Sequence, residues 1–220
     1  VPEAFGVSGT PEPAGAACPT AAMAADEPVE LPSVDPFVDG AAVKKLGDLP
    51  YQIIDRNRSR IHTVIAPEGA VCVAQLDLYQ NEGIISEPAG ALSVASLDQL
   101  NARPGEVIVC IVSGGNNDVL RYAEIMERSL VYRGLKHYFL VNFPQKPGQL
   151  RMFLNDILGP DDDIALFEYL KRNNRETGAA LVGIELRNAT DLDALVARMD
   201  ESPLDCRRLM PGTPEYDFLT

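Results

Sequence analysis

The chain has 220 residues, 46% of them hydrophobic and 23% charged, so it can bury one sizeable core, or one domain and a smaller one. Its net charge of −13 argues against nucleic acid and anionic membrane surfaces as partners. The chain has four scattered cysteines and only two histidines, so we expect no zinc site. The scattered cysteines also suit a reducing, cytoplasmic location. We expect no membrane span, because no run of about 18 apolar residues occurs, and no secretory signal.

Strands and helices are predicted to alternate along the first 134 residues. β-Branched and apolar runs predict the strands, and apolar positions three and four residues apart predict the helices. Gly83 is placed to cap the end of one helix. Such alternation implies an α/β fold with a parallel sheet and right-handed crossovers. The expected strands are His62–Ala66, Ile84–Ser86 and Glu106–Val112, and the expected helices are Asp48–Ser59, Pro67–Glu82, Ala89–Leu100 and Asp118–Arg133.

The pattern changes after Gly134, where the predicted elements follow the order βαββαβ. This order is that of a ferredoxin-like module. Thr190 is expected to cap its second helix. We therefore divide the chain into residues 1–134 and residues 135–220, which are joined without a long linker. The expected strands are His137–Phe143, Ile164–Asn173, Ala179–Leu186 and Leu204–Leu209, and the expected helices are Gly148–Leu158 and Asp191–Met199.

The most informative stretch is VIVCIVSGGNND, residues 107–118. Its apolar run predicts a strand buried on both faces, and the polar turn from Ser113 to Asn116 follows where that strand ends. Glycine lets the backbone take positive φ and approach a ligand closely. Open α/β sheets bind ligands at the carboxyl ends of their strands. The stretch therefore predicts a ligand site, although an ordinary strand–helix turn would show the same spacing.

Further motifs accompany this turn in a fixed order. Upstream lie PFVDG, ending at Gly40, and EPAGA, starting at Glu87; downstream lie KHYFLVNFPQKPGQL and LFEYLKRNNRETGAALVGIEL. From about Pro11 to the C-terminus, this set resembles the biosynthetic threonine dehydratases, pyridoxal-phosphate enzymes of fold type II, in their short form with one C-terminal ACT-like regulatory domain. The resemblance implies a strand ending at Glu12-Pro13, followed by a helix near residues 16–25.

The resemblance covers only the C-terminal half of these enzymes. Their N-terminal half carries a Ser-Tyr-Lys segment whose lysine binds the cofactor, a Ser-Gly-Asn-His loop and a tetraglycine phosphate loop, and none of these occurs here. The complete enzyme would use pyridoxal 5'-phosphate to convert L-threonine to 2-oxobutanoate and ammonia, the committed step towards isoleucine. We expect the isolated chain to be inactive. Its five lysines stand in other contexts: Lys44, Lys45, Lys136, Lys146 and Lys171.

The resemblance also assigns roles to single residues near the turn. The Ser113 hydroxyl would bind the pyridine nitrogen of the cofactor, because a hydroxyl can donate to an unprotonated nitrogen; its alternative role is to cap the following helix. Gly114 would give room for the ring. Glu87 would lie near the ring or substrate, or else only in a loop. Asn116 and Asn117 would hold the turn or else contact the cofactor, and Asp39 is expected to brace its own turn.

No divalent metal site is expected. The related serine racemases bind a divalent ion through a glutamate, a backbone carbonyl and an aspartate near the Glu-Pro position. Glu12 matches that glutamate, but Cys18 stands where the aspartate would be. A hard cation prefers oxygen ligands, so this departure argues against a metal.

The loop NFPQKPGQL is the candidate regulatory site. Backbone N–H groups at a helix start suit a carboxylate, and neighbouring apolar side chains could accept a branched aliphatic chain. The resemblance implies isoleucine as inhibitor, valine as its antagonist, and a homo-oligomer, a tetramer in the complete enzyme. The candidate effector-binding residues are Asn142, Phe143, Gln149 and Leu150, of which Phe143 and Leu150 would equally serve as core residues.

Two other functions stay open from the sequence. The absent lysine is also consistent with a non-catalytic module that binds branched-chain amino acids. A related type II enzyme, such as a serine racemase or a catabolic dehydratase, would share the turn after Val112, but the C-terminal module argues against it.

Overall fold

The computed structural model describes residues 8–169 and 176–219. The chain forms two compact units, Val1–Ser129 and Leu130–Thr220, and each is described by itself. The last four residues of the predicted strand Ile164–Asn173 lie outside the described residues. Among the described residues, no helix has both the length and the apolar character needed to span a lipid bilayer.

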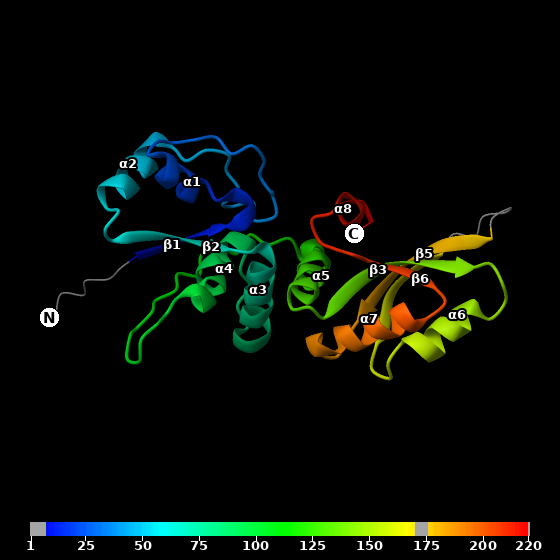
Figure 1. Cartoon of the computed structure of the whole chain (residues 1–220). Coiled ribbons are helices and arrows are strands. Elements are labelled where there is room, and N and C mark those ends of the chain that lie inside the picture. Colours follow the sequence, from blue (N-terminus) through cyan, green and yellow to red (C-terminus); the bar gives the residue numbers. More distant parts are fainter. Residues whose placement is uncertain (1–7, 170–175, 220) are drawn as a thin grey trace. The chain divides into compact units, whose positions relative to one another are not determined.

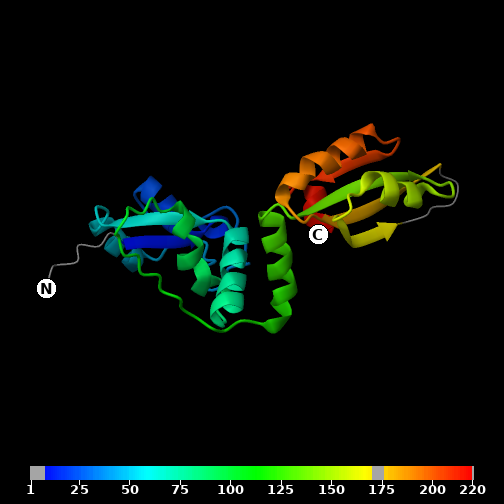
Figure 2. The ribbon, with the colours of Figure 1, turned by 90° about the horizontal axis from the view of Figure 1, so that it is seen from below.

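The first unit is built on two parallel strands (Figure 1). Strand β1, Ser8–Pro13, pairs with β2, Ile61–Ala66, and places Glu12 opposite Ile65. Helices α1, Cys18–Ala25, and α2, Asp48–Arg56, lie on one face of this pair, and α3 and α4 lie on the other (Figures 1 and 2). The parallel pairing and the expected helices of this region are confirmed.

Helices α3, Glu68–Glu82, and α4, Pro88–Ala95, form the core of the first unit. Gly83 ends α3 in the left-handed conformation, with φ +67°, as its predicted capping role requires. The helices pack small and branched apolar side chains against each other and against Phe37 and Val38. The buried core comprises Phe37, Val38, Ala66, Val71, Cys72, Ala74, Leu76, Ala91, Leu92, Ala95 and Ile125.

The buried strand predicted at Glu106–Val112 is wrong. Residues 101–118 contain neither helix nor strand, and the side chains of Val107, Val109 and Ile111 are 88%, 80% and 76% exposed. A strand buried on both faces needs ladder partners on both sides. In the described part of the chain, β1 and β2 pair only with each other, so this apolar run has no neighbour. The short strand predicted at Ile84–Ser86 is wrong as well.

The second unit is a four-stranded antiparallel sheet in the order β4-β5-β3-β6 (Figure 1). The predicted order βαββαβ is confirmed, and the sheet order is that of a ferredoxin-like fold. The helices α6 and α7 cover one face of the sheet. The strands are β3, Lys136–Pro144, β4, Asp163–Tyr169, β5, Thr177–Glu185, and β6, Asp205–Leu209; the helices are α6, Gln149–Met152, and α7, Leu192–Glu201.

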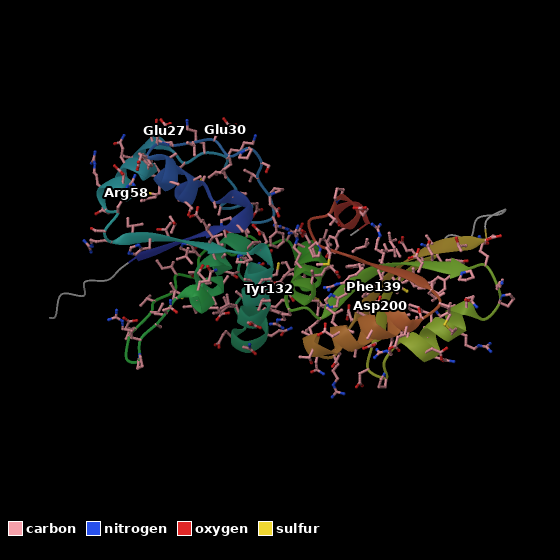
Figure 3. The ribbon with its side chains drawn as sticks, viewed as in Figure 1. Glu27, Glu30, Arg58, Tyr132, Phe139 and Asp200 are labelled. Atoms are coloured by element: carbon pink, nitrogen blue, oxygen red, sulfur yellow. The ribbon has the colours of Figure 1, made fainter. Side chains whose placement is uncertain are left out.

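Alternate side chains of β3 face opposite sides of the sheet. Phe139, Val141 and Phe143 are buried in the core under α6 and α7. Figure 3 labels Phe139 on β3 and Asp200 on α7. Tyr138 faces the other side, where its ring meets that of Tyr216 edge-on, with ring centres 5.7 Å apart. Tyr216 belongs to α8, Pro214–Leu219, a helix too short for sequence periodicity to reveal.

Two local predictions in this unit need correction. The helix expected at Gly148–Leu158 is one α-helical turn, α6, followed by a π-helical turn, Phe153–Ile157. Thr190 lies inside the 3-10 turn that precedes α7 and is not its cap. That turn is closed instead by a capping box, in which the Asn188 N–H donates to Asp191 Oδ2 at 3.2 Å.

Candidate functional site

Three motifs that are far apart in the sequence meet in the first unit. The Glu87 N–H donates to the Gly114 carbonyl oxygen at 3.1 Å. A Cβ atom on Gly90 would stand 1.6 Å from the Ser113 carbonyl oxygen, and a Cβ atom on Gly40 would stand 3.3 Å from Glu87 Oε1. PFVDG, EPAGA and the Ser-Gly-Gly-Asn turn are therefore in direct contact, and glycine is what permits the close approach at residue 90.

Gly114 and Glu87 share the centre of this contact. Gly114 has φ +73°, and a Cβ atom on it would stand 2.1 Å from Oε1 of the half-buried Glu87. The carboxylate thus occupies the space that any other residue at position 114 would need. Position 114 requires glycine for two reasons: its φ is positive, and no space is left for a Cβ atom.

Ser113 does not cap the helix that follows it. Asp118 is the cap: its side chain accepts a hydrogen bond from the Leu120 N–H at 2.9 Å. This cap opens the 3-10 turn Val119–Arg121, which continues as α5, Tyr122–Tyr132. Within the described part of the chain, the exposed Ser113 hydroxyl makes no hydrogen bond, so it is available to a ligand.

The turn after Ser113 is held by Asn117 rather than by Asn116. The Asn117 N–H donates to the Gly115 carbonyl at 2.9 Å, and its Nδ2 donates to the Ser86 carbonyl at 3.2 Å. Asn116 is exposed and makes no hydrogen bond to the described residues. Of the two asparagines expected to hold the turn, Asn117 therefore does so and Asn116 does not.

Arg121 holds the PFVDG motif against α5. Its Nη2 donates to the Phe37 carbonyl at 2.6 Å, and its Nη1 lies 3.6 Å from Asp39 Oδ2. The guanidinium of Arg128 lies 4.3 Å from the centre of the Phe37 ring, a cation–π contact. Asp39 Oδ1 accepts the Gly40 N–H at 2.9 Å, so Asp39 braces its turn as expected. Nothing in the spacing of the sequence pointed to either arginine, because each contact spans more than eighty residues.

Glu12 is engaged by the start of α1. Its carboxylate accepts the Thr20 N–H at 3.2 Å and also the Thr20 hydroxyl. Burial raises the pKa of Glu12, and the bonds from Thr20 oppose that rise. Cys18 is buried nearby, and burial together with the charge of Glu12 raises the pKa of its thiol. Among the described residues, no three or more His, Cys, Asp or Glu side chains come together as a metal site.

The second unit contains a cavity of about 290 Å³ where β3 and β4 end. This volume is close to the lower end of the usual range for small-molecule sites, about 300 Å³. Three of the four predicted effector-binding residues line it, but Asn142 turns away and donates to Asp205 Oδ2 at 2.6 Å. The lining residues are Phe143, Pro144, Gln145, Lys146, Pro147, Gly148, Gln149, Leu150, Phe167 and Tyr169.

Aromatic rings form the inner wall of this cavity. The Phe143 ring is buried and meets the rings of Phe153, Phe167 and Tyr169 edge-on, with centres 5.5, 6.1 and 6.0 Å apart. Phe143 is thus a core residue and a cavity wall at once. Phe167 and Tyr169 could not be predicted from the sequence, because β4 reaches this end of the sheet only through its pairing with β5.

The polar side of the cavity differs from the expected helix start. Helix α6 is a single turn, so its backbone dipole is small. Lys146, in the loop before α6, places a formal positive charge beside the cavity instead. Gln149 adds an amide, while the Gln145 amide already donates to the Thr177 carbonyl at 3.2 Å. An apolar wall with one cation suits a small carboxylate with an apolar side chain.

Comparison with known proteins identifies relatives of both units. Residues 2–114 match the family described as pyridoxal-phosphate dependent enzyme. Residues 127–219 match the C-terminal regulatory domain of threonine dehydratase. The second match shows that the ferredoxin-like unit is similar to a known regulatory domain.

Curated relatives match nearly the whole chain. The chain is 70% identical over 209 residues to the biosynthetic L-threonine dehydratase of Corynebacterium glutamicum, covering 95% of this chain and 48% of that protein. It is 62% identical to the Mycobacterium leprae enzyme, covering 94% and 49%, and 50% identical to the Bacillus subtilis enzyme, covering 87% and 45%. The chain therefore spans about half the length of the curated relatives it matches.

Solved structures give weaker similarities. The processed form of threonine deaminase isoform 2 from Solanum lycopersicum matches with 28% identity and a TM-score of 0.48, covering 54% of this chain and 35% of that one. Maize serine racemase matches with 26% identity and a TM-score of 0.46, covering 56% and 39%.

Proposed function

Because the chain belongs to the family of pyridoxal-phosphate dependent enzymes, we propose that it is the C-terminal half of a biosynthetic threonine dehydratase. The complete enzyme converts L-threonine to 2-oxobutanoate and ammonia. The observation that carries this proposal is the contact of Glu87 with Gly114 beside the exposed Ser113 hydroxyl, in a chain whose second unit matches a threonine dehydratase regulatory domain.

The residues present fit one part of the cofactor, the pyridine ring with its nitrogen. Ser113 offers a hydroxyl, and Gly115 carries no side chain that would obstruct a flat ring, whereas the Glu87 carboxylate fills the side-chain position of Gly114. Space remains above Gly115, where a Cβ atom would meet nothing closer than the Ile85 carbonyl oxygen at 3.7 Å. The lysine and the phosphate loop of the family are not in this sequence, so the carbonyl and phosphate ends of the cofactor would need residues from elsewhere.

Ser113 has the main chemical role among these residues. When bound, pyridoxal phosphate supplies the electron sink that stabilises negative charge at the substrate α-carbon. A hydroxyl that donates to the ring nitrogen leaves this nitrogen unprotonated, whereas a carboxylate would favour the pyridinium. The weaker sink favours β-elimination, in which charge leaves with the hydroxyl group of threonine. Glu87, in contact with Gly114, would lie near the ring or the substrate.

We assign residues 1–134 to the catalytic part and residues 135–220 to a regulatory domain. In the regulatory domain, the cavity near Lys146 binds isoleucine as inhibitor, with valine as its antagonist. The ammonium of Lys146 would meet the ligand carboxylate, and the rings of Phe143 and Phe167 would meet its branched side chain. The complete enzyme is proposed to be a cytoplasmic homo-oligomer, a tetramer. Four free cysteines support the reducing compartment.

A chimera tests the proposed reaction. The N-terminal half of the Corynebacterium glutamicum dehydratase is fused ahead of this chain, in place of the half that this chain matches. We expect the chimera to form 2-oxobutanoate from L-threonine and the isolated chain to form none. A chimera that racemises serine without deaminating threonine would support a serine racemase. A folded chimera that carries the cofactor but turns over neither amino acid would overturn the proposal in favour of a non-catalytic binding module.

A further inference from the structure

One peptide unit at the candidate site is tied on both of its polar groups. Its carbonyl, that of Ser86, accepts from Gln75 Nε2 at 2.9 Å and from Asn117 Nδ2 at 3.2 Å. Its N–H, that of Glu87, donates to the Gly114 carbonyl at 3.1 Å. Two of these bonds come from the turn after Ser113, and the third comes from helix α3. The orientation of this peptide plane therefore depends on Gln75 as well as on the turn itself.

Gln75 is unlike its buried neighbours on α3. Gln75 is a polar residue and yet only 1% exposed, whereas the other buried residues of this helix are apolar: Val71, Cys72, Ala74 and Leu76. Burying an amide costs free energy unless its hydrogen bonds are replaced. Among the described residues, the Gln75 Oε1 has no partner, so only the bond that Nε2 donates to Ser86 offsets the cost of burial. Methionine would fill the same space without an unpaired oxygen.

Three buried side-chain oxygens around this peptide have no hydrogen-bond partner among the described residues. Like Gln75 Oε1, the buried Ser86 Oγ and Asn117 Oδ1 lack partners within the described residues. An under-satisfied polar cluster is a poor source of stability. The arrangement instead suits a role in orienting the backbone. Two side-chain amides from separate elements donate to one carbonyl oxygen, that of Ser86, immediately before Glu87.

We propose that Gln75 is a positioning residue that sets the Glu87 carboxylate against Gly114, and with it the ring-binding edge beside Ser113. It acts through the Ser86–Glu87 peptide, because the plane of that peptide decides the direction in which the Glu87 side chain leaves the backbone. The identity of the ring as pyridoxal phosphate rests on the function proposed above. The geometry itself involves this chain alone.

Hydrogen exchange of the isolated, ¹⁵N-labelled chain tests the positioning role directly. The variant Gln75→Met removes the donor and keeps the length of the side chain. We expect the Glu87 amide to exchange about tenfold faster, as suits the loss of one buried hydrogen bond, and the amide resonances of Gly114 and Gly115 to shift. The matched control is Gln99→Met, which removes a glutamine bond to the Ile65 carbonyl, 2.6 Å long, elsewhere in the unit. The control should leave all three amides unchanged.

A second variant keeps the test decisive if Gln75→Met does not fold. Asn117→Ala removes the other amide from the same carbonyl, that of a half-buried side chain, and should speed exchange at Glu87 in the same way. Wild-type exchange at Glu87 in Gln75→Met overturns the proposal. Where that variant does not fold, wild-type exchange at Glu87 in Asn117→Ala overturns it.

The chimera supplies a readout that a purely structural role would not change. Gln75→Met should weaken pyridoxal phosphate binding about tenfold, in proportion to one lost hydrogen bond, and alter the absorption of the bound cofactor, while Gln99→Met changes neither. Unaltered affinity and absorption in Gln75→Met would overturn the proposal. If the wild-type chimera binds no cofactor, the proposed function fails, and the exchange measurement on the chain still decides whether Gln75 positions Glu87.

Discussion

Arg208 determines which ring nitrogen of neutral His137 carries the proton. Arg208 Nη2 lies 3.1 Å from His137 Nδ1, and because a guanidinium can only donate, Nδ1 must accept. The proton of the neutral ring therefore sits on Nε2, which donates to the Gly134 carbonyl at 2.9 Å. Both ring nitrogens are engaged only while His137 is neutral, and protonation would break the bond from Arg208.

The stability of the second unit should therefore fall in mild acid. Burial lowers the pKa of His137 below its ordinary value of 6.5, the bond to Gly134 opposes this, and the charge of Arg208 adds to the lowering. The unfolded chain then binds more protons than the folded chain, so the contribution of His137 is full above pH 6.5 and is lost as the pH falls through the folded pKa.

Thermal unfolding between pH 7 and pH 5 measures this dependence. His137→Gln should remove the part of the pH slope that belongs to His137, because glutamine has no titrating group. His62→Gln, at the exposed histidine of β2, should retain the wild-type slope. Identical slopes for wild type and His137→Gln would show that the His137–Arg208 bond does not control stability.

Gly114→Ala should displace the Glu87 carboxylate. Alanine at positive φ costs about 1–2 kcal/mol, and its Cβ would stand 2.1 Å from Glu87 Oε1. We expect more than a tenfold loss of cofactor affinity in the chimera, titrated by cofactor fluorescence. Gly83→Ala is the matched control, since Gly83 also has positive φ but a Cβ there would meet nothing within 4 Å. Equal effects of the two substitutions would mean that backbone strain alone matters.

Ser113→Ala should weaken cofactor binding while leaving the fold intact. The hydroxyl is exposed and makes no bond within the described residues, so its loss removes only the proposed contact to the ring nitrogen. One lost hydrogen bond of about 1–3 kcal/mol corresponds to roughly a tenfold or greater loss of affinity. Cofactor titration and turnover of threonine by the chimera check this, with circular dichroism to verify folding. Wild-type affinity and kcat would remove Ser113 from the site.

Isoleucine should bind the isolated chain through its second unit, as measured by calorimetry. Gln149→Ala removes an amide that lines the cavity and should weaken binding, and Phe143→Leu should weaken it by reshaping the aromatic wall. Asn142→Ala is the control, because Asn142 points to Asp205 and not into the cavity. If neither isoleucine nor valine binds at millimolar concentration, the second unit is better described as an oligomerisation domain.

Much of this architecture could be predicted because it rests on local chemistry. The cap at Gly83 depends on one residue's freedom at positive φ, and the order βαββαβ depends on periodicities that span a few residues each. Prediction from local chemistry failed where a strand needs neighbouring strands to form. The apolar run from Val107 to Val112 has the composition of a buried strand, but a strand is stabilised by neighbouring strands, and none lies beside it in the described residues.

The sequence by itself determined the two units and the turn that opens with Ser113. Only the tertiary structure decided what surrounds that turn: Glu87 contacts it at Gly114, Gln75 binds the Ser86 carbonyl next to Glu87, and Asp118 takes the capping role. The same holds for the cavity, where Phe167 joins Phe143 through strand pairing. A site is set by distances between residues far apart in the chain, and those distances arise only when burial and strand pairing close the intervening loops.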